Sequence, residues 1–150
     1  MKGRVVAVAK LPSEVARVTG SYVLIMTLDR PCRVEVGALG EIHFPAGAYA
    51  YAGSAMGGLD ARIARHLRDD KRLHWHVDYL LQHAEVAEVV RVESDERLEC
   101  RIASALAERL AVVERFGSSD CACPGHLFGP DSLADSISAV KAAVAAAGNW

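Results

Sequence analysis

The alternation of apolar and polar residues predicts β-strands in the first part of the chain. The clearest segment, SYVLIMTL at 21–28, is rich in β-branched and aromatic side chains and is bounded by Gly20 and by a turn sequence that ends in Pro31. Shorter alternating segments follow, and the last one ends at Gly53. The predicted strands span 21–28, 33–36, 41–44 and 48–52. The pattern indicates a long strand, an intervening hairpin and a return strand.

Helical spacing of apolar residues dominates the rest of the chain. Leucine and isoleucine recur every four positions at 59, 63 and 67, and again between 98 and 110. We expect Ser94 to cap the second of these helices and Pro130 with Ser132 to open the last one. The predicted helices span 59–68, 74–83, 94–110 and 131–147, and a short strand is predicted at 86–92.

These elements predict one domain, residues 1–150, of the α/β (α+β) class. We expect a small, mostly antiparallel sheet with an inserted hairpin, flanked by helices. Hydrophobic residues make up 51% of the chain, which is enough for a core without help from disulfides or a metal.

Composition limits where the protein is expected to be located and which partners it is expected to bind. No apolar run approaches the length needed to span a bilayer, and the N-terminal segment lacks the apolar region of a secretory signal. We therefore expect a soluble, cytoplasmic protein with no membrane partner. The net charge of −2 argues mildly against nonspecific coating of nucleic acid, although it leaves room for a small basic site.

The segment between Ala50 and Arg72 contains the most candidate chemistry. A predicted strand leads into a small-residue loop and then into a helix, and glycines in such a loop let a backbone approach a ligand closely. On the helix, Arg62, Arg65 and His66 share a face, which Arg72 would extend if the helix continued. Taken alone, a charged helix face is more often simply solvated.

The combination of these segments resembles the GIY-YIG nuclease family. In that family a Gly-Ile-Tyr strand and a Tyr-Ile-Gly strand precede a helix with an essential arginine. Here Gly20-Ser21-Tyr22 and Tyr51-Ala52-Gly53 correspond to the triads, and Arg62-Ile63-Ala64-Arg65-His66 is similar to an Arg-x-x-Arg-His pattern of some members. The segments YAGSA, HWHVDYLL and SSDCACPGHLFG resemble a prokaryotic branch of the DUF123 or Uri type, over about Thr19–Gly129.

Three departures from the family pattern accompany the resemblance. The triads lie farther apart than usual, which we attribute to the hairpin around 37–44. Ser21 and Ala52 replace the isoleucines, which affects sheet packing rather than chemistry. The family's late asparagine has no clear equivalent, because Asn149 lies near the C-terminus.

The resemblance implies a phosphodiester hydrolase with the catalytic residues Tyr22, Tyr51, Arg62, His66 and Glu99. Arg62 would stabilise the phosphorane charge, and one of the two tyrosines would orient or deprotonate the water. His66 would shuttle a proton or hold a phosphate oxygen. Glu99, on a later helix, would hold one Mg²⁺ or Mn²⁺ ion, with Glu96 as the competing choice.

We expect nucleic acid to contact a second set of residues: Gly53, Ser54, Arg65, Arg72 and His74. His74 and Asp78 form either an orienting pair or a hydrogen-bonded helix start. DNA is the expected partner, with RNA not excluded. Because the branch is sometimes fused to a base-excision endonuclease, the resemblance also implies association with DNA-repair enzymes. The oligomeric state stays open.

The cysteines offer a different chemistry. Cys121, Cys123 and His126 have zinc-ligand side chains, and either Cys32 or Cys100 would have to supply a fourth ligand. The spacing differs from the usual zinc-knuckle pair, and buried free cysteines are common, so the sequence favours free thiols over zinc. Another interpretation packs this loop, with Ser118, Ser119, Asp120 and His126, against the nuclease site in place of the asparagine.

Three functions therefore follow from the sequence. The first is a metal-dependent endonuclease acting on structured or damaged DNA. The second is a non-catalytic nucleic-acid-binding module of the same fold. The third is a zinc- or thiol-based protein centred on the Cys121–His126 segment.

Overall fold

The computed structural model describes residues 4–7, 18–118 and 121–148. Its main feature is a six-stranded sheet in the order β1-β6-β2-β5-β8-β7, accompanied by a separate two-stranded sheet, β3-β4. The strands are β1 (Arg4–Ala7), β2 (Gly20–Leu28), β3 (Cys32–Glu35), β4 (Glu41–Phe44), β5 (Gly47–Ala55), β6 (Glu85–Glu93), β7 (Val112–Val113) and β8 (Leu127–Asp131). The helices are the 3₁₀ turn η1 (Gly37–Leu39), α1 (Leu59–Leu67), α2 (His76–Leu80), α3 (Glu99–Ala107) and α4 (Leu133–Gly148).

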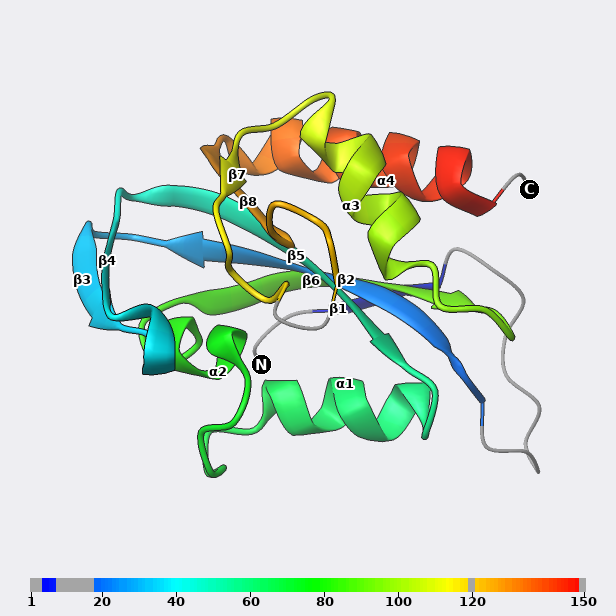
Figure 1. Cartoon of the computed structure of the whole chain (residues 1–150), viewed down its shortest axis with the longest axis horizontal. Helices are drawn as coiled ribbons and strands as arrows, with labels where there is room; N and C mark the ends of the chain where they lie inside the picture. Colours follow the sequence, from blue (N-terminus) through cyan, green and yellow to red (C-terminus); the bar gives the residue numbers. More distant parts are fainter. Residues whose placement is uncertain (1–3, 8–17, 119–120, 149–150) are drawn as a thin grey trace.

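The large sheet separates two apolar layers. Figure 1 shows α3 and α4 on one face of the sheet and α1 with α2 on the other. Along β2, Leu24 and Met26 are buried toward α1 and α2, whereas Val23 and Ile25 are buried toward α3 and α4. This alternation is the period-2 pattern of a strand covered on both faces. The α+β class predicted from the sequence is confirmed.

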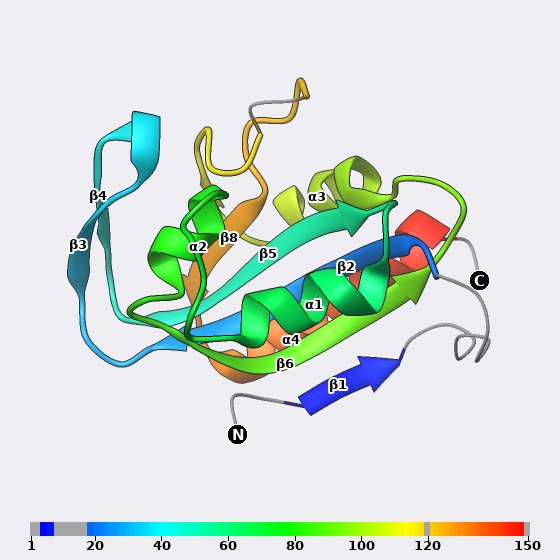
Figure 2. The same ribbon diagram turned by 90° about the horizontal axis from the view of Figure 1, so that it is seen from below.

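All strand pairs of the large sheet are antiparallel except one. β1 pairs with β6 in parallel and forms an edge, and Figure 2 shows it beyond β6 while α1 lies along β2 and β6. The chain leaves the large sheet after β2, forms the β3–β4 hairpin, and returns as β5. The hairpin predicted to lengthen the spacing between Tyr22 and Tyr51 is therefore confirmed.

Several predicted boundaries were wrong. The return strand does not end at Gly53, because β5 pairs with β2 as far as Ala55. The helix predicted at 74–83 is reduced to α2, since the Asp78 carboxylate accepts hydrogen bonds from the backbone N–H groups of His74 and Trp75 and holds them outside the helix.

The two last helices also differ from the prediction. Ser94 accepts a hydrogen bond from Glu96 N in a turn, while α3 starts only at Glu99 and ends at Ala107. α4 starts after Ser132, whose hydroxyl accepts from Asp135 N, but Pro130 belongs to β8. β1, β7 and β8 were not predicted. None of the helices in the described part of the chain is long and apolar enough to cross a membrane.

Candidate active site

A polar cavity of about 270 Å³ opens where the ends of β2 and β5 meet α1 and α3. Residues from six separate parts of the chain line it, among them Tyr22, Tyr51, Arg62, Trp75 and Glu99. Four of these were predicted as catalytic residues. The fold thus brings two phenols, a guanidinium and a carboxylate together in one cavity.

Strand pairing places the two tyrosines on the same face of the sheet. Tyr22 on β2 lies opposite Gly53 on β5, and Tyr51 lies opposite Leu24, two residues along the same face. A Cβ atom at Gly53 would lie 2.5 Å from the Tyr22 hydroxyl oxygen. The glycine of the second triad therefore leaves room for the ring of the first.

Tyr22 is bound to a buried histidine. Its hydroxyl lies 2.8 Å from His66 Nε2, and both side chains are about 1% exposed. Burial raises the pKa of Tyr22 to about 12, although the nearby Arg62 guanidinium lowers it. Burial lowers the pKa of His66 to about 3, against the opposite effect of Asp78. At neutral pH the pair is thus a neutral phenol and a neutral imidazole.

The tautomer of His66 follows from its second nitrogen. His66 Nδ1 lies 3.9 Å from Asp78 Oδ1, and a carboxylate favours a proton on the nitrogen that faces it. We therefore assign the proton to Nδ1, so that Nε2 accepts the hydrogen bond from Tyr22. Tyr51 is also buried, and burial raises its pKa well above the ordinary value.

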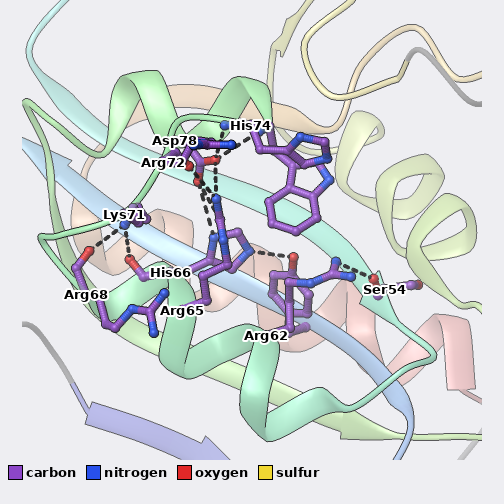
Figure 3. Close-up of polar contacts among 11 residues, drawn as sticks. Ser54, Arg62, Arg65, His66, Arg68, Lys71, Arg72, His74 and Asp78 are labelled. Atoms are coloured by element: carbon purple, nitrogen blue, oxygen red, sulfur yellow. Dashed lines mark hydrogen bonds and ion pairs between the residues drawn. The ribbon is translucent and has the colours of Figure 1, made fainter.

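Arg62 is held in the cavity by a backbone carbonyl and an aromatic ring, and its guanidinium also forms a hydrogen bond with Tyr22. Its Nη1 donates to the Ser54 carbonyl oxygen at 3.1 Å, and its Cζ lies 4.3 Å from the centre of the Trp75 ring (Figure 3). The remaining N–H groups of a guanidinium held in this way are available for an anion. A fixed, multidentate cation at the cavity suits a phosphate group.

Arg65 has a different environment from Arg62, although both contact Trp75. It forms a bidentate pair with Asp78, with both N···O distances 3.0 Å, and also donates to the Arg72 carbonyl oxygen (Figure 3). Burial alone raises the pKa of Asp78, but the hydrogen bonds from Arg65 and from backbone N–H groups lower it below the ordinary value. The pair fixes the segment that presents Trp75.

Glu99 reaches the cavity from the first residue of α3. Its side chain is 19% exposed, with Oε1 3.7 Å from Arg97 Nη1 and Oε2 3.4 Å from His126 Nδ1. Glu96, the competing candidate, is 67% exposed and pairs with Arg101. Only Glu99 of these two lines the cavity.

A buried serine pair joins the elements that carry these groups. Ser21 Oγ lies 2.7 Å from Ser54 Oγ and accepts a hydrogen bond from the backbone N–H of Leu98 at 3.0 Å. Ser21 thus anchors the residue before Glu99, while the carbonyl of Ser54 holds Arg62. The serine that replaces a triad isoleucine ties the strands to α3, a role that sequence comparison did not indicate.

The residues predicted to bind nucleic acid are not gathered in one place. Gly53 and Ser54 border the cavity, whereas Arg72 lies beyond the end of α1 and does not extend its charged face. His74 is exposed and packs edge-on against Trp75. Ser119, Asp120 and Asn149 lie outside the described residues.

Sequence reasoning missed five lining residues of the cavity, and two of them, Trp75 and Arg97, bring an aromatic ring and a cation to it. Trp75 contacts both arginines, and the 70%-exposed Arg97 stands at the rim beside Glu99. The signal for Trp75 was its place in the His-Trp-His run that follows the arginine helix. For Arg97 it was a spacing of two residues from the candidate carboxylate.

A cluster of sulfur and imidazole groups lies beside Glu99 but does not line the cavity. The ligand atoms of Cys100, Cys121, Cys123 and His126 all lie within 4.8 Å of one another. The sequence left open whether Cys32 or Cys100 would complete this set of ligands, and the fold places Cys100 there. The fourth cysteine of the chain, Cys32, is on the β3–β4 hairpin.

Comparison with protein families gives a match over most of the chain. The model of the family described as a domain of unknown function, DUF123, matches residues 21–149. The chain belongs to the DUF123 family. The searches of curated proteins and of solved structures found no match.

Every residue of the cavity falls inside the DUF123 match. The DUF123 part of the resemblance is confirmed, and the cavity lies within the segment that matches DUF123. Its oxygen donors suit a hard divalent cation, because Mg²⁺ typically takes one or two carboxylates and completes its shell with water and substrate phosphates. Glu99 is the carboxylate that would hold such an ion.

Proposed function

We propose that this DUF123 domain is a divalent-metal-dependent endonuclease that hydrolyses phosphodiester bonds in structured or damaged DNA. The observation that supports it most is the convergence of Tyr22, Tyr51, Arg62 and Glu99 on one polar cavity. The triads that resemble GIY-YIG nucleases supply the two tyrosines. The cysteine cluster does not line this cavity, and its thiols have no part in the proposed chemistry.

Tyr22 is the proposed general base. Its pKa of about 12 means that little tyrosinate exists at neutral pH, so the phenol acts through His66. As Tyr22 Oη accepts a proton from water, it passes its own proton to His66 Nε2, 2.8 Å away. Burial disfavours the imidazolium that forms, and Asp78, 3.9 Å from Nδ1, offsets part of this cost.

Arg62 and Tyr51 would act on the phosphate. Arg62 is fixed by Ser54 and Trp75, so its free N–H groups stabilise the charge that grows on the phosphorane without reorganisation. Tyr51 remains a neutral phenol and donates a hydrogen bond into the cavity. Glu99 would hold Mg²⁺ or Mn²⁺, which supplies Lewis-acid stabilisation of the phosphate and the leaving oxygen when bound.

The proposal is tested by cleavage of branched, single-stranded and damaged DNAs with Mn²⁺. We expect Arg62→Ala to lose about 100-fold to 1000-fold in rate, the scale of removing one transition-state donor. Arg68→Ala is the matched control, because Arg68 is an exposed arginine at the C-terminal end of α1 outside the cavity. We expect it to cleave as wild type does.

A second pair of variants separates the two acidic candidates. Glu99→Gln should abolish Mn²⁺-dependent cleavage, whereas Glu96→Gln should not, since Glu96 only pairs with Arg101 at the surface. Circular dichroism of each variant establishes that it is folded. Undiminished cleavage by both Arg62→Ala and Glu99→Gln would refute the proposal. Salt-sensitive DNA binding with no cleavage in any metal would instead favour the non-catalytic module.

A further inference from the structure

The cluster beside Glu99 draws ligands from three parts of the fold. Cys100 is the second residue of α3, Cys121 and Cys123 lie in the loop before β8, and His126 immediately precedes β8. His126 is 1% exposed. Its backbone N–H donates a hydrogen bond to the Phe116 carbonyl oxygen, and its own carbonyl oxygen accepts one from the Ala52 N–H. The imidazole is therefore held firmly at the centre of the cluster.

The distances within the cluster match a tetrahedral metal site. Zinc–sulfur bonds of about 2.3 Å and zinc–nitrogen bonds of about 2.0 Å place neighbouring ligand atoms roughly 3.5–3.8 Å apart. His126 Nε2 lies 3.4 Å from Cys121 Sγ and 3.9 Å from Cys100 Sγ. The four ligand atoms, all within 4.8 Å of one another, need only small shifts to surround one ion.

The chemistry of the group also favours a metal over four separate side chains. The thiols of Cys100, Cys121 and Cys123 gather around one imidazole, that of His126. A zinc ion would deprotonate these thiols and bind the thiolates together with the neutral imidazole. An apolar pocket of about 470 Å³ beside Cys100 and Cys123 provides a route from solvent.

We propose that Cys100, Cys121, Cys123 and His126 bind one structural zinc ion that joins α3 to the start of β8. All four positions are filled by protein ligands, which is the arrangement of structural rather than catalytic zinc. The ion would fix the loop segment at 121–126 and the first turn of α3 to each other. It differs in place and in ligand type from the divalent ion proposed at Glu99.

The zinc would also fix the tautomer of His126. Coordination through Nε2 leaves the proton on Nδ1, a buried atom with no hydrogen-bond partner in the described structure and with Glu99 Oε2 3.4 Å away. A metal-bound histidine commonly donates its other N–H to a carboxylate. His126 is thus a positioning residue for Glu99; this link, unlike the zinc site itself, rests on the proposed nuclease function.

The first experiment measures zinc in the full chain purified under reducing conditions without chelators. We expect about one zinc per chain by elemental analysis, and X-ray absorption that fits three sulfurs at about 2.3 Å and one nitrogen at about 2.0 Å. Cobalt(II) in place of zinc should give the d–d bands of a tetrahedral site and thiolate-to-cobalt charge transfer. No bound zinc, together with no such cobalt spectrum, would overturn the proposal.

Cysteine variants test the ligand set. Cys123→Ser should weaken zinc binding by more than about 100-fold in competition with a chromophoric chelator, since even outer-shell losses cost 10–100-fold. Cys32→Ser is the matched control and should retain the zinc of wild type, because Cys32 lies on the separate hairpin. Equal zinc loss in both variants would overturn the assignment.

Thiol modification keeps the proposal testable if a ligand variant does not fold. In the wild-type chain Cys32 should react first, and the three ligand thiols should react only after a strong chelator removes the zinc. If all four thiols react equally fast before chelation, the site does not hold a metal. None of these measurements depends on nuclease activity, so failure of the nuclease proposal would leave the zinc result unchanged.

Discussion

The position of Tyr22 depends on the absence of a side chain on the neighbouring strand. Gly53 lies directly opposite Tyr22 in the β2–β5 pair, and the phenol occupies the space where a Cβ would stand. Tyr22 in turn reaches His66 on α1 from this position. A single methyl group at Gly53 would therefore displace the proposed base from its partner.

We predict that Gly53→Ala lowers Mn²⁺-dependent cleavage by about 100-fold, because a displacement of about 1 Å in a catalytic group has effects of this size. Gly57→Ala is the matched control: it also borders the cavity, but its Cβ would meet nothing within 4 Å. The measurement is the single-turnover rate of both variants, together with the NMR signals of the His66 ring. If Gly53→Ala cleaves as fast as Gly57→Ala, the Tyr22–His66 pair is not the base.

The helices and strands divide into those that local sequence determines and those that distant contacts determine. β2, β6 and α1 follow their own periodicity, and the sequence predicts them within a few residues. The start of α3 is different, because the residue before it is anchored by Ser21, 77 positions earlier in the chain. No pattern around residues 94–99 reveals that contact, so Ser94 was a reasonable but wrong cap.

The candidate site also contains residues that the local sequence predicts and residues that only the fold brings together. Arg62 and His66 are four residues apart on one helix, so their shared face follows from helical spacing. Cys100 could not be preferred over Cys32 from the sequence, because only the packing of α3 beside the loop before β8 selects it. Trp75 was missed for a similar reason. Asp78 accepts a hydrogen bond from its backbone N–H, so α2 begins only at His76 and Trp75 stays outside the helix, where it contacts Arg62 and Arg65.

The link between Ser21 and α3 makes a testable contribution to stability. Ser21→Ala removes the acceptor of the buried Leu98 N–H, and an unsatisfied buried donor costs about 1–3 kcal/mol. Ser136→Ala is the matched control, because Ser136 is fully buried on α4 and its hydroxyl has no hydrogen-bond partner in the described structure. We expect urea unfolding to show a loss for Ser21→Ala and little or no loss for Ser136→Ala.

A larger loss for Ser136→Ala than for Ser21→Ala would contradict this account of how α3 is anchored. The m-values of the two variants should match that of wild type, so that the difference reflects the native state rather than residual structure in the unfolded chain. Ser21→Ala should also reduce cleavage, since Glu99 follows Leu98 directly.

The charge of the whole molecule limits how it could bind DNA. The net charge is −2, so attraction to phosphates has to come from a local group of cations rather than from the molecule as a whole. Arg65 is already neutralised by Asp78. Arg62 inside the cavity and Arg97 at its rim remain as the cations beside Glu99, which indicates a small contact with few phosphates.

This limit predicts a weak salt dependence of DNA binding. Two or three phosphate contacts give a slope of log K against log salt of about −2 to −3 for duplex DNA, since each contact contributes about −0.9. Arg97→Ala should reduce the slope by about one contact, measured by fluorescence anisotropy without added Mg²⁺ or Mn²⁺ to prevent cleavage. Arg33→Ala is the matched control: both arginines are 70% exposed and have a carboxylate within 4 Å, but Arg33 lies on the β3–β4 hairpin. Because both variants change the net charge equally, an equal reduction of the slope would place the DNA away from the cavity and contradict the nuclease proposal.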